Sequence, residues 1–205
     1  MMRIGIMGGT FDPPHLGHVV PIRAAAMEFQ LDEVWFVPNF RPPHKTRRDF
    51  ADPYHRAAMV GIALQQDSNF VLCTIELLRQ KPSYTVHTLS RIRKMISAND
   101  RLFFLMGSDS FLELTTWYQY ARLLRETDLI IINRGNTKKE LNEALEKLET
   151  ITKADLHKTV HFAHTSFLPF SSTQIRIAIQ EGRDVSEQVG TEVQAYIQKH
   201  SLYQR

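Results

Sequence analysis

The chain has 205 residues, 43% of them hydrophobic and 23% charged, with a formal net charge of +3 at pH 7. This length fits one domain, and no apolar run approaches the roughly 20 residues that a membrane-spanning helix needs. The mild positive charge does not indicate a nucleic-acid-binding face. The single cysteine, Cys73, excludes an internal disulfide, so we expect a protein of the reducing cytoplasm.

In the first part of the chain, short apolar runs alternate with segments of helical periodicity. In chain order the pattern predicts a strand over 2–7, a helix over 16–29, a strand over 33–37, a helix over 54–65 and a strand over 70–74. Gly8 and Gly9 are expected to end the first strand. Residues 38–53 contain four prolines, so we expect a long loop there, and such loops inside compact domains are often functional.

The alternation continues to the end of the chain. The pattern predicts a helix over 83–96, a strand over 102–106, short helices over 108–114 and 118–125, a strand over 129–132, a helix over 138–149, a strand over 160–163, and helices over 172–180 and 186–200. Alternating strands and helices are typical of an α/β fold with a doubly wound parallel sheet, Rossmann-like, of about five to six strands. Ligands of such sheets bind beyond the carboxyl ends of the strands. We expect residues 1–205 to form one domain.

The first candidate site is Gly-Gly-Thr-Phe-Asp-Pro-Pro-His-Leu-Gly-His at 8–18. It follows a strand and opens a helix, which favours phosphate binding because glycines allow close approach and a helix N-terminus carries unpaired N–H groups. His15 and His18 are three residues apart, so they project to one side if both lie in the first turn. Each imidazole can donate to a phosphate. The alternatives are a metal-binding pair, more typical at i,i+4 with a third ligand, or two surface histidines.

Three further segments each allow two interpretations. The helix start at 169–176 combines hydroxyl groups with Arg176, so it predicts either a second phosphate cradle or an ordinary capped helix. Gly-Ser-Asp at 107–109 follows the most apolar strand and suits a ribose or base, or only caps a helix. Trp-Tyr at 117–118 belongs to the core or stacks on a flat ring. The basic residues at 41–48 contact phosphates or form a solvated loop.

Together these segments resemble the nicotinate-mononucleotide adenylyltransferases of bacterial NAD synthesis, in the nucleotidyltransferase superfamily with a His-x-Gly-His motif. The resemblance covers essentially the whole chain. It rests on Gly-Gly-Thr-Phe-Asp-Pro-Pro-His-Leu-Gly-His at 8–18, Pro-Asn at 38–39, Pro-Pro-His-Lys at 42–45, Ser-Tyr-Thr at 83–85, Gly-Ser-Asp at 107–109, Thr-Trp-Tyr at 116–118 and Ser-Ser-Thr-Gln-Ile-Arg at 171–176. The first and last are shared across the superfamily. Phe170 and Arg134-Gly135 depart from the family pattern, which concerns only fine pocket shape.

The resemblance implies adenylyl transfer from ATP, accompanied by Mg²⁺, to nicotinate mononucleotide, with helices of about 171–205 completing the ATP site. It implies catalytic roles for His15, His18 and Arg176, with His18 close to the transferred α-phosphate. The implied ATP contacts are Gly8, Gly9, His15, His18, His44, Lys45, Gly107, Asp109, Ser172, Thr173 and Arg176. The implied mononucleotide contacts are Thr10 and Asn39, with Gly9, at the phosphate and Thr85, Trp117 and Tyr118 at the pyridine ring.

Other functions stay open at this point. A sister transferase would act on phosphopantetheine or form CDP-alcohols, a non-catalytic sensor would bind ATP without releasing pyrophosphate, and a nucleic-acid binder would use the loop at 41–48. The choice between the acid and amide forms of the pyridine substrate is open as well. We expect no nucleic-acid or membrane partner, and the sequence leaves open whether the chain forms a homo-oligomer.

Overall fold

The computed structural model describes residues 1–41, 50–79 and 83–204. Its strands are β1 (Arg3–Gly9), β2 (Glu33–Pro38), β3 (Phe70–Leu72), β4 (Arg101–Gly107), β5 (Asp128–Ile132) and β6 (Val160–Ala163). They form one sheet in the order β3-β2-β1-β4-β5-β6. The order reverses between β1 and β4, which is the doubly wound arrangement of Rossmann-like folds. The predicted fold class and the number of strands are confirmed.

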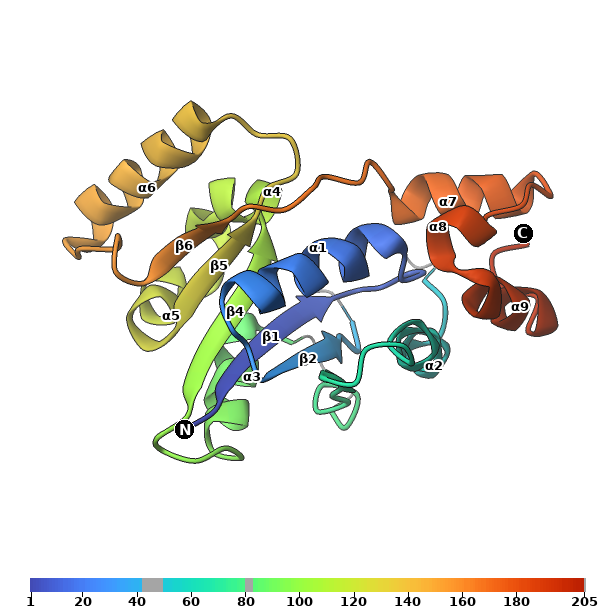
Figure 1. Ribbon diagram of the computed structural model, residues 1–205, viewed down its shortest axis with the longest axis horizontal. Coiled ribbons are helices and arrows are strands. Elements are labelled where there is room, and N and C mark those ends of the chain that lie inside the picture. The colour runs from blue at the N-terminus through green and yellow to red at the C-terminus, as the bar shows by residue number, and fades with distance from the viewer. Residues whose placement is uncertain (42–49, 80–82, 205) are drawn as a thin grey trace. The chain divides into compact units, whose positions relative to one another are not determined.

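Helices follow the strands along the chain, as Figure 1 shows. They are α1 (Leu16–Glu28), α2 (Pro53–Ala63), α3 (Thr85–Arg93), α4 (Ser108–Leu112), the 3₁₀ turn η1 (Leu114–Thr116), α5 (Tyr120–Glu126), α6 (Lys138–Thr152), α7 (Ser172–Gln180), α8 (Ser186–Val189) and α9 (Thr191–Lys199). In the part of the chain that the structure describes, no helix has both the length and the apolar character needed to cross a membrane.

The chain divides into two compact units. The first unit comprises Met1–Met7, Pro21–Val34 and Tyr84–Phe167, and the second comprises Gly8–Val20, Trp35–Ser83 and Leu168–Arg205. Each unit is described separately below. The expectation of a single domain stays a prediction.

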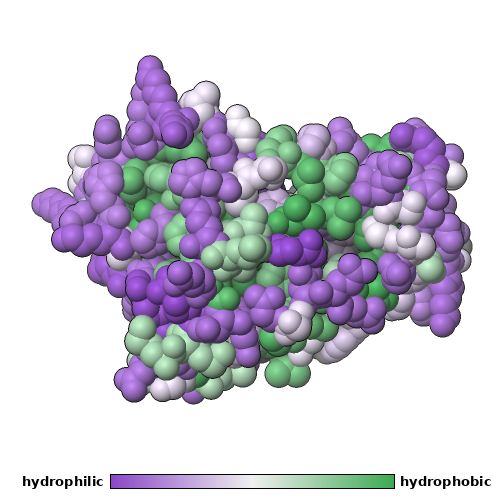
Figure 2. All heavy atoms as spheres, viewed as in Figure 1, coloured by the Kyte–Doolittle hydropathy of each residue, from purple (hydrophilic) through white to green (hydrophobic). Residues whose placement is uncertain are grey.

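The first unit is built on the parallel pairs β1–β4, β4–β5 and β5–β6. Its strands are buried apolar runs, and Leu129 and Ile130 are fully buried, as expected for a sheet covered on both faces. Helix α6 buries Leu141, Leu145 and Leu148, which follow the helical period. Its other residues are mostly charged, and the surface over α6 is hydrophilic in Figure 2.

The second unit has its own apolar core, to which α2, α7, α8 and α9 contribute (Figure 1). Met59 of α2 packs in this core together with residues of α7 and of the last two helices. The members of this core are Met59, Ile175, Ala178, Val185, Val189, Val193 and Ile197. Because Ile175 and Ala178 of α7 are buried in this core, the rotation of α7 about its own axis is fixed.

Two element boundaries differ from the prediction in ways that matter. β1 continues through Gly8 and Gly9, because the N–H of Asn39 donates to the carbonyl oxygen of Gly9 at 3.0 Å and extends the ladder. The single helix predicted over 186–200 is two helices. Gly190 separates them with φ 88° and ψ 150°, a backbone conformation that an α-helix cannot contain and that glycine adopts readily. The remaining elements shift by a few residues at their ends.

Candidate active site

His15 and His18 lie together at the start of α1. The N–H of His18 donates to the carbonyl oxygen of His15 at 2.8 Å, which places both residues in the first turn. Their rings lie 3.7 Å apart between centroids. The main-chain N–H of His15 donates to Nδ1 of His18 at 3.3 Å. Since Nδ1 accepts this bond, a neutral His18 carries its proton on Nε2, the nitrogen that can then donate to a phosphate.

The glycines of the same segment make room for rings. A Cβ on Gly17 would lie 3.0 Å from Nδ1 of His15. A Cβ on Gly9 would lie 2.7 Å from the ring of Phe11. Phe11 has φ 51°, a conformation that a bulky residue rarely adopts, and its ring meets that of His18 edge-on at 5.2 Å. These glycines are therefore needed for the packing that holds the two imidazoles, a role beyond close approach to a ligand.

Asp12 is a buried carboxylate in the middle of the segment, with 2% of its surface exposed. Its Oδ1 accepts from the N–H of Ala51 at 3.1 Å and from the hydroxyl of Tyr203 at 2.8 Å. Its Oδ2 lies 3.5 Å from Nη1 of Arg176. We did not identify Asp12 or Tyr203 as site residues from the sequence.

Helix α7 brings the second predicted phosphate-binding segment to the first. Nη1 of Arg176 donates to the main-chain oxygen of Asp12 at 2.6 Å, and Nη2 donates to Oγ1 of Thr173 at 3.1 Å. The Ser172 hydroxyl donates to the carbonyl oxygen of Pro13 at 3.0 Å. Ser171 occupies the N-cap position without a side-chain capping bond, so the predicted hydroxyl cap is not formed. Instead, the Ser172 hydroxyl ties α7 to Pro13 and the Arg176 guanidinium ties it to Asp12.

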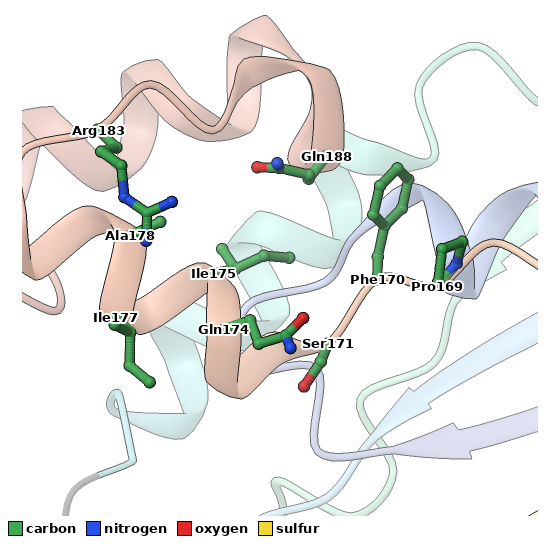
Figure 3. Close-up of a pocket in the computed structure, with 9 residues that line it drawn as sticks. All are labelled: Pro169, Phe170, Ser171, Gln174, Ile175, Ile177, Ala178, Arg183 and Gln188. Atoms are coloured by element: carbon green, nitrogen blue, oxygen red, sulfur yellow. The ribbon is translucent and has the colours of Figure 1, made fainter.

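A pocket of about 330 Å³ lies beside α7, also within the second unit. Figure 3 shows Phe170, Gln174 and Arg183 among the side chains around it. Gln174, Ile177 and Ala178 line it, and these α7 residues differ from the three predicted to bind phosphate. Phe170, the departure noted above, lies in this lining and also meets the ring of His15 edge-on at 6.4 Å.

Thr10 and Asn39, both predicted at the mononucleotide phosphate, lie next to each other. Nδ2 of Asn39 donates to Oγ1 of Thr10 at 3.3 Å. The buried side chain of Arg56 on α2 contacts both residues, and only 1% of the surface of Arg56 is exposed. Its guanidinium donates to the main-chain oxygens of Thr10 at 2.6 Å, Asn39 at 2.8 Å and Phe40 at 3.0 Å.

Arg56 was missed at the sequence level, although the sequence contains a signal for it. It shares a helix face with Met59 and Val60, which are buried. A charged residue on the apolar face of a helix is rarely buried unless it is paired. Burial lowers the pKa of the Arg56 guanidinium, and the carboxylate of Asp12 opposes that shift. Arg56 therefore stays a cation that braces the loop residues around Thr10 and Asn39.

The first unit brings the predicted pyridine-binding residues together. Thr85 is the first residue of α3, and Tyr84 precedes it. The ring of Tyr84 lies 4.6 Å from that of Tyr118, and the ring of His87 lies 5.5 Å from it. Tyr118 is 46% exposed, so this cluster is accessible. The sequence analysis assigned no role to Tyr84, the central residue of the Ser-Tyr-Thr element, or to His87, which lies two residues beyond it.

Trp117 is half-buried and meets Phe104 edge-on at 6.2 Å. The contact with Phe104 fits the interpretation of Trp117 as a core residue, and its role as a stacking platform stays a prediction. Gln119 has φ 53°, and this left-handed residue separates the segment of Trp117 and Tyr118 from α5. The tight turn keeps both aromatic residues outside the helices.

Gly107 and Asp109 lie at the end of β4 and in the first turn of α4. A Cβ on Gly107 would lie 2.7 Å from Nε of Arg134, so the Arg134 side chain covers the main chain at this point. The N–H of Arg134 donates to the Ser108 hydroxyl at 2.9 Å. Arg134 was noted above only as a departure from the family pattern, and it borders a predicted ATP contact.

His44 and Lys45 lie outside the described residues. Among the residues that the structure describes, no group of three or more His, Cys, Asp or Glu side chains is arranged to hold a metal ion.

The strand order, the paired histidines and the α7 contacts define a nucleotidyltransferase, and residues 6–178 match the cytidylyltransferase-like family model. Within that class the chain belongs to the nicotinate-nucleotide adenylyltransferase family. It is 34% identical to the nicotinate-nucleotide adenylyltransferase of Bacillus subtilis (strain 168), with all of both chains covered. It is 36% identical to the "Probable nicotinate-nucleotide adenylyltransferase" of Thermoanaerobacter sp. (strain X514), covering 100% of this chain and 95% of that one.

Solved structures show the same fold. Two structures of the Plasmodium falciparum nicotinic acid mononucleotide adenylyltransferase, one complexed with APC and one with NaAD, each match with a TM-score of 0.76. The matches cover 99% of this chain and 98% of those chains, at 19% and 20% identity.

Proposed function

We propose that this protein transfers the adenylyl group of ATP to nicotinate mononucleotide, forming nicotinate adenine dinucleotide (deamido-NAD) and releasing pyrophosphate. The observation that carries the proposal is the attachment of α7 to the histidine segment. Arg176 donates to the main-chain oxygen of Asp12, and Ser172 donates to that of Pro13. Two stretches suited to phosphate, about 160 residues apart in sequence, therefore belong to one site.

The reaction is an in-line displacement at the α-phosphorus of ATP. A phosphate oxygen of the mononucleotide forms the new P–O bond while the bond to the pyrophosphate oxygen breaks. The attacking phosphate is already ionised, so the protein supplies neither a nucleophile nor a general base. Catalysis then rests on positioning the two phosphates and stabilising the charge that develops. Mg²⁺ enters with ATP as part of the substrate, held by phosphate oxygens and water.

In this proposal the residues of the second unit handle phosphates. His18 donates from Nε2 to the α-phosphate, and His15 supports it. Arg176, Thr173 and the N-terminus of α7 hold the β- and γ-phosphates, because a helix start with an adjacent guanidinium favours anions.

The remaining roles concern the mononucleotide phosphate and the ring systems. The mononucleotide phosphate is placed by Thr10 and Asn39, which Arg56 braces, together with Gly9. The nearby ATP phosphates are contacted by Gly8 and Gly9. In the first unit, Gly107 and Asp109 meet the adenosine. Trp117 stacks on the pyridine ring, and Thr85 and Tyr118 meet its carboxylate. The roles of His44 and Lys45, the cytoplasmic location and the oligomeric state stay predictions.

One assay tests the proposal against its alternatives. Pyrophosphate release from Mg–ATP is measured with nicotinate mononucleotide, nicotinamide mononucleotide and phosphopantetheine in separate reactions. We expect release with nicotinate mononucleotide at a rate well above that of the other two. Equal rates with both pyridine nucleotides would contradict the preference for the acid, and release with phosphopantetheine alone would indicate a sister transferase. ATP binding without release from any of them would indicate a sensor.

A further inference from the structure

Tyr203, two residues before the end of the chain, reaches into the candidate active site of the second unit. Its hydroxyl donates to Oδ1 of Asp12 at 2.8 Å. The chain after α9 turns through left-handed backbone at Ser201 (φ 49°) and at Tyr203 itself (φ 63°). Such conformations persist only where the surrounding structure determines them. Here Leu202 and Tyr203 pack against the core of α2, α7, α8 and α9, which holds the turn in place.

The carboxylate that Tyr203 contacts also faces Arg176. Two donors, the Tyr203 hydroxyl and the N–H of Ala51, converge on Oδ1 of Asp12. The other oxygen, Oδ2, is thereby directed to Nη1 of Arg176, 3.5 Å away. Asp12 holds the same Nη1 through its main-chain oxygen at 2.6 Å. Removal of the Tyr203 hydroxyl would leave Oδ1 with the N–H of Ala51 as its donor and Oδ2 with the long contact to Arg176, so the carboxylate would be less firmly oriented.

The hydroxyl of Tyr203 acts as a donor across the working pH range. Burial raises its pKa far above the ordinary value for tyrosine, and the negative charge of Asp12 shifts it in the same direction. Asp12 accepts from this buried hydroxyl and faces Arg176, so its carboxyl group has a defined orientation. The three side chains form a row from the end of the chain to α7.

We propose that Tyr203 is a positioning residue for the ATP phosphates: its hydroxyl orients the Asp12 carboxylate, and Asp12 in turn orients the Arg176 guanidinium. The inference rests on the proposed function for the identity of the ligand that Arg176 meets. Tyr203 touches no substrate in this account. We expect its effect mainly on ATP, because Arg56 braces Thr10 and Asn39, whereas Arg176 donates to Asp12 and Thr173.

Tyr203→Phe tests the proposal, because it removes the hydroxyl and keeps the ring. Tyr196→Phe is a matched control, since its hydroxyl lies 2.9 Å from Nδ1 of His55 on α2 and belongs to the same C-terminal region. For Tyr203→Phe we expect a KM for ATP raised by about three- to tenfold, the effect of losing one ordinary hydrogen bond, because the lost bond acts on ATP only through Asp12 and Arg176. The KM for the mononucleotide should stay within about twofold of wild type. For Tyr196→Phe we expect both constants unchanged.

A double-mutant cycle shows whether Tyr203 acts through Asp12. In an Asp12→Asn background, Tyr203→Phe should change the KM for ATP by less than twofold, because the oriented anion is already lost. An unchanged KM for ATP in Tyr203→Phe would overturn the proposal. The proposal would also be overturned if the KM rose equally for ATP and for the mononucleotide while the melting temperature fell, since that pattern indicates a purely structural role.

The test remains informative if the proposed pyridine substrate is wrong. The Kd of Mg–ATP, measured by titration calorimetry on the full chain, should rise by a similar factor in Tyr203→Phe and stay constant in Tyr196→Phe. Failure of pyrophosphate release with nicotinate mononucleotide would count against the proposed function alone. An unchanged Kd for Mg–ATP would count against the role of Tyr203.

Discussion

The imidazole of His15 stacks on that of His18, with 3.7 Å between ring centroids and planes inclined by 32°. The main-chain N–H of His15 donates to Nδ1 of His18 at 3.3 Å. A neutral His18 therefore carries its proton on Nε2, the nitrogen that we propose donates to the α-phosphate.

His18→Ala is expected to lower kcat by roughly 100- to 1000-fold, the usual effect of removing one preorganised donor to a developing charge. Steady-state pyrophosphate release measures it. His157→Ala is the control, because that histidine is 69% exposed and lies beside Glu149 in the first unit. A near-normal kcat for His18→Ala would show that the transition state does not depend on this imidazole.

Gly9→Ala is expected to destabilise the protein by about 1–3 kcal/mol, because the new methyl group would overlap the Phe11 ring. The displaced ring also meets His18, so activity should fall with stability. Chemical denaturation gives the free energy of unfolding. In Gly61→Ala the new Cβ would lie 3.4 Å from Leu72, an ordinary contact within a helix, so this variant should match wild type or gain stability. Equal behaviour of the two variants would contradict the packing argument.

Arg56→Met is expected to cost about 3 kcal/mol of unfolding free energy, because it removes the donor to three part-buried carbonyl oxygens. Arg56→Lys should recover only part of the loss, since an ammonium group cannot reproduce the guanidinium fork. Thermal and urea denaturation measure both variants. Arg122→Ala, which removes an exposed i,i+4 ion pair with Glu126, should be indistinguishable from wild type. Full stability of Arg56→Met would rule out a bracing role.

Tyr118→Ala is expected to raise the KM for nicotinate mononucleotide by roughly two- to tenfold, which corresponds to the loss of one hydrogen bond from its hydroxyl to the pyridine carboxylate. The KM for ATP should not change. Tyr54→Ala is the control, since Tyr54 is 60% exposed and lies at the start of α2. A rise in the KM for ATP with no change for the mononucleotide would place the pyridine ring away from the cluster of Tyr84, His87 and Tyr118.

Much of the site could be predicted because its chemistry is local. The spacing of His15 and His18, three residues within one helical turn, by itself predicts neighbouring imidazoles. Likewise, the position of Thr173 and Arg176 in one helix turn predicts the contact that the structure shows. The elements with strong apolar periodicity were predicted in the right order, because burial on both faces of a strand or on one face of a helix leaves a clear pattern.

The break at Gly190 and the extension of β1 through Gly9 could not be predicted from local patterns. Gly190 lies in a segment whose apolar spacing suits one continuous helix, and only the backbone angles show two. The extra residues of β1 depend on a hydrogen bond from Asn39, which comes from a different part of the chain. Pairing of this kind is a property of the assembled sheet and leaves no signal in the residues of a single strand.

The sequence by itself determined the alternation of strands and helices, the two segments predicted to bind phosphate and the family that they resemble, because each depends on residues close together in the chain. Only the tertiary structure decided that Asp12 lies between Arg176 and Tyr203, and that Arg56 holds Thr10 and Asn39. Those contacts join residues up to 191 positions apart. Packing of the helix core, and not local propensity, brings them together, since a buried charge is stable only where distant partners complete its hydrogen bonds.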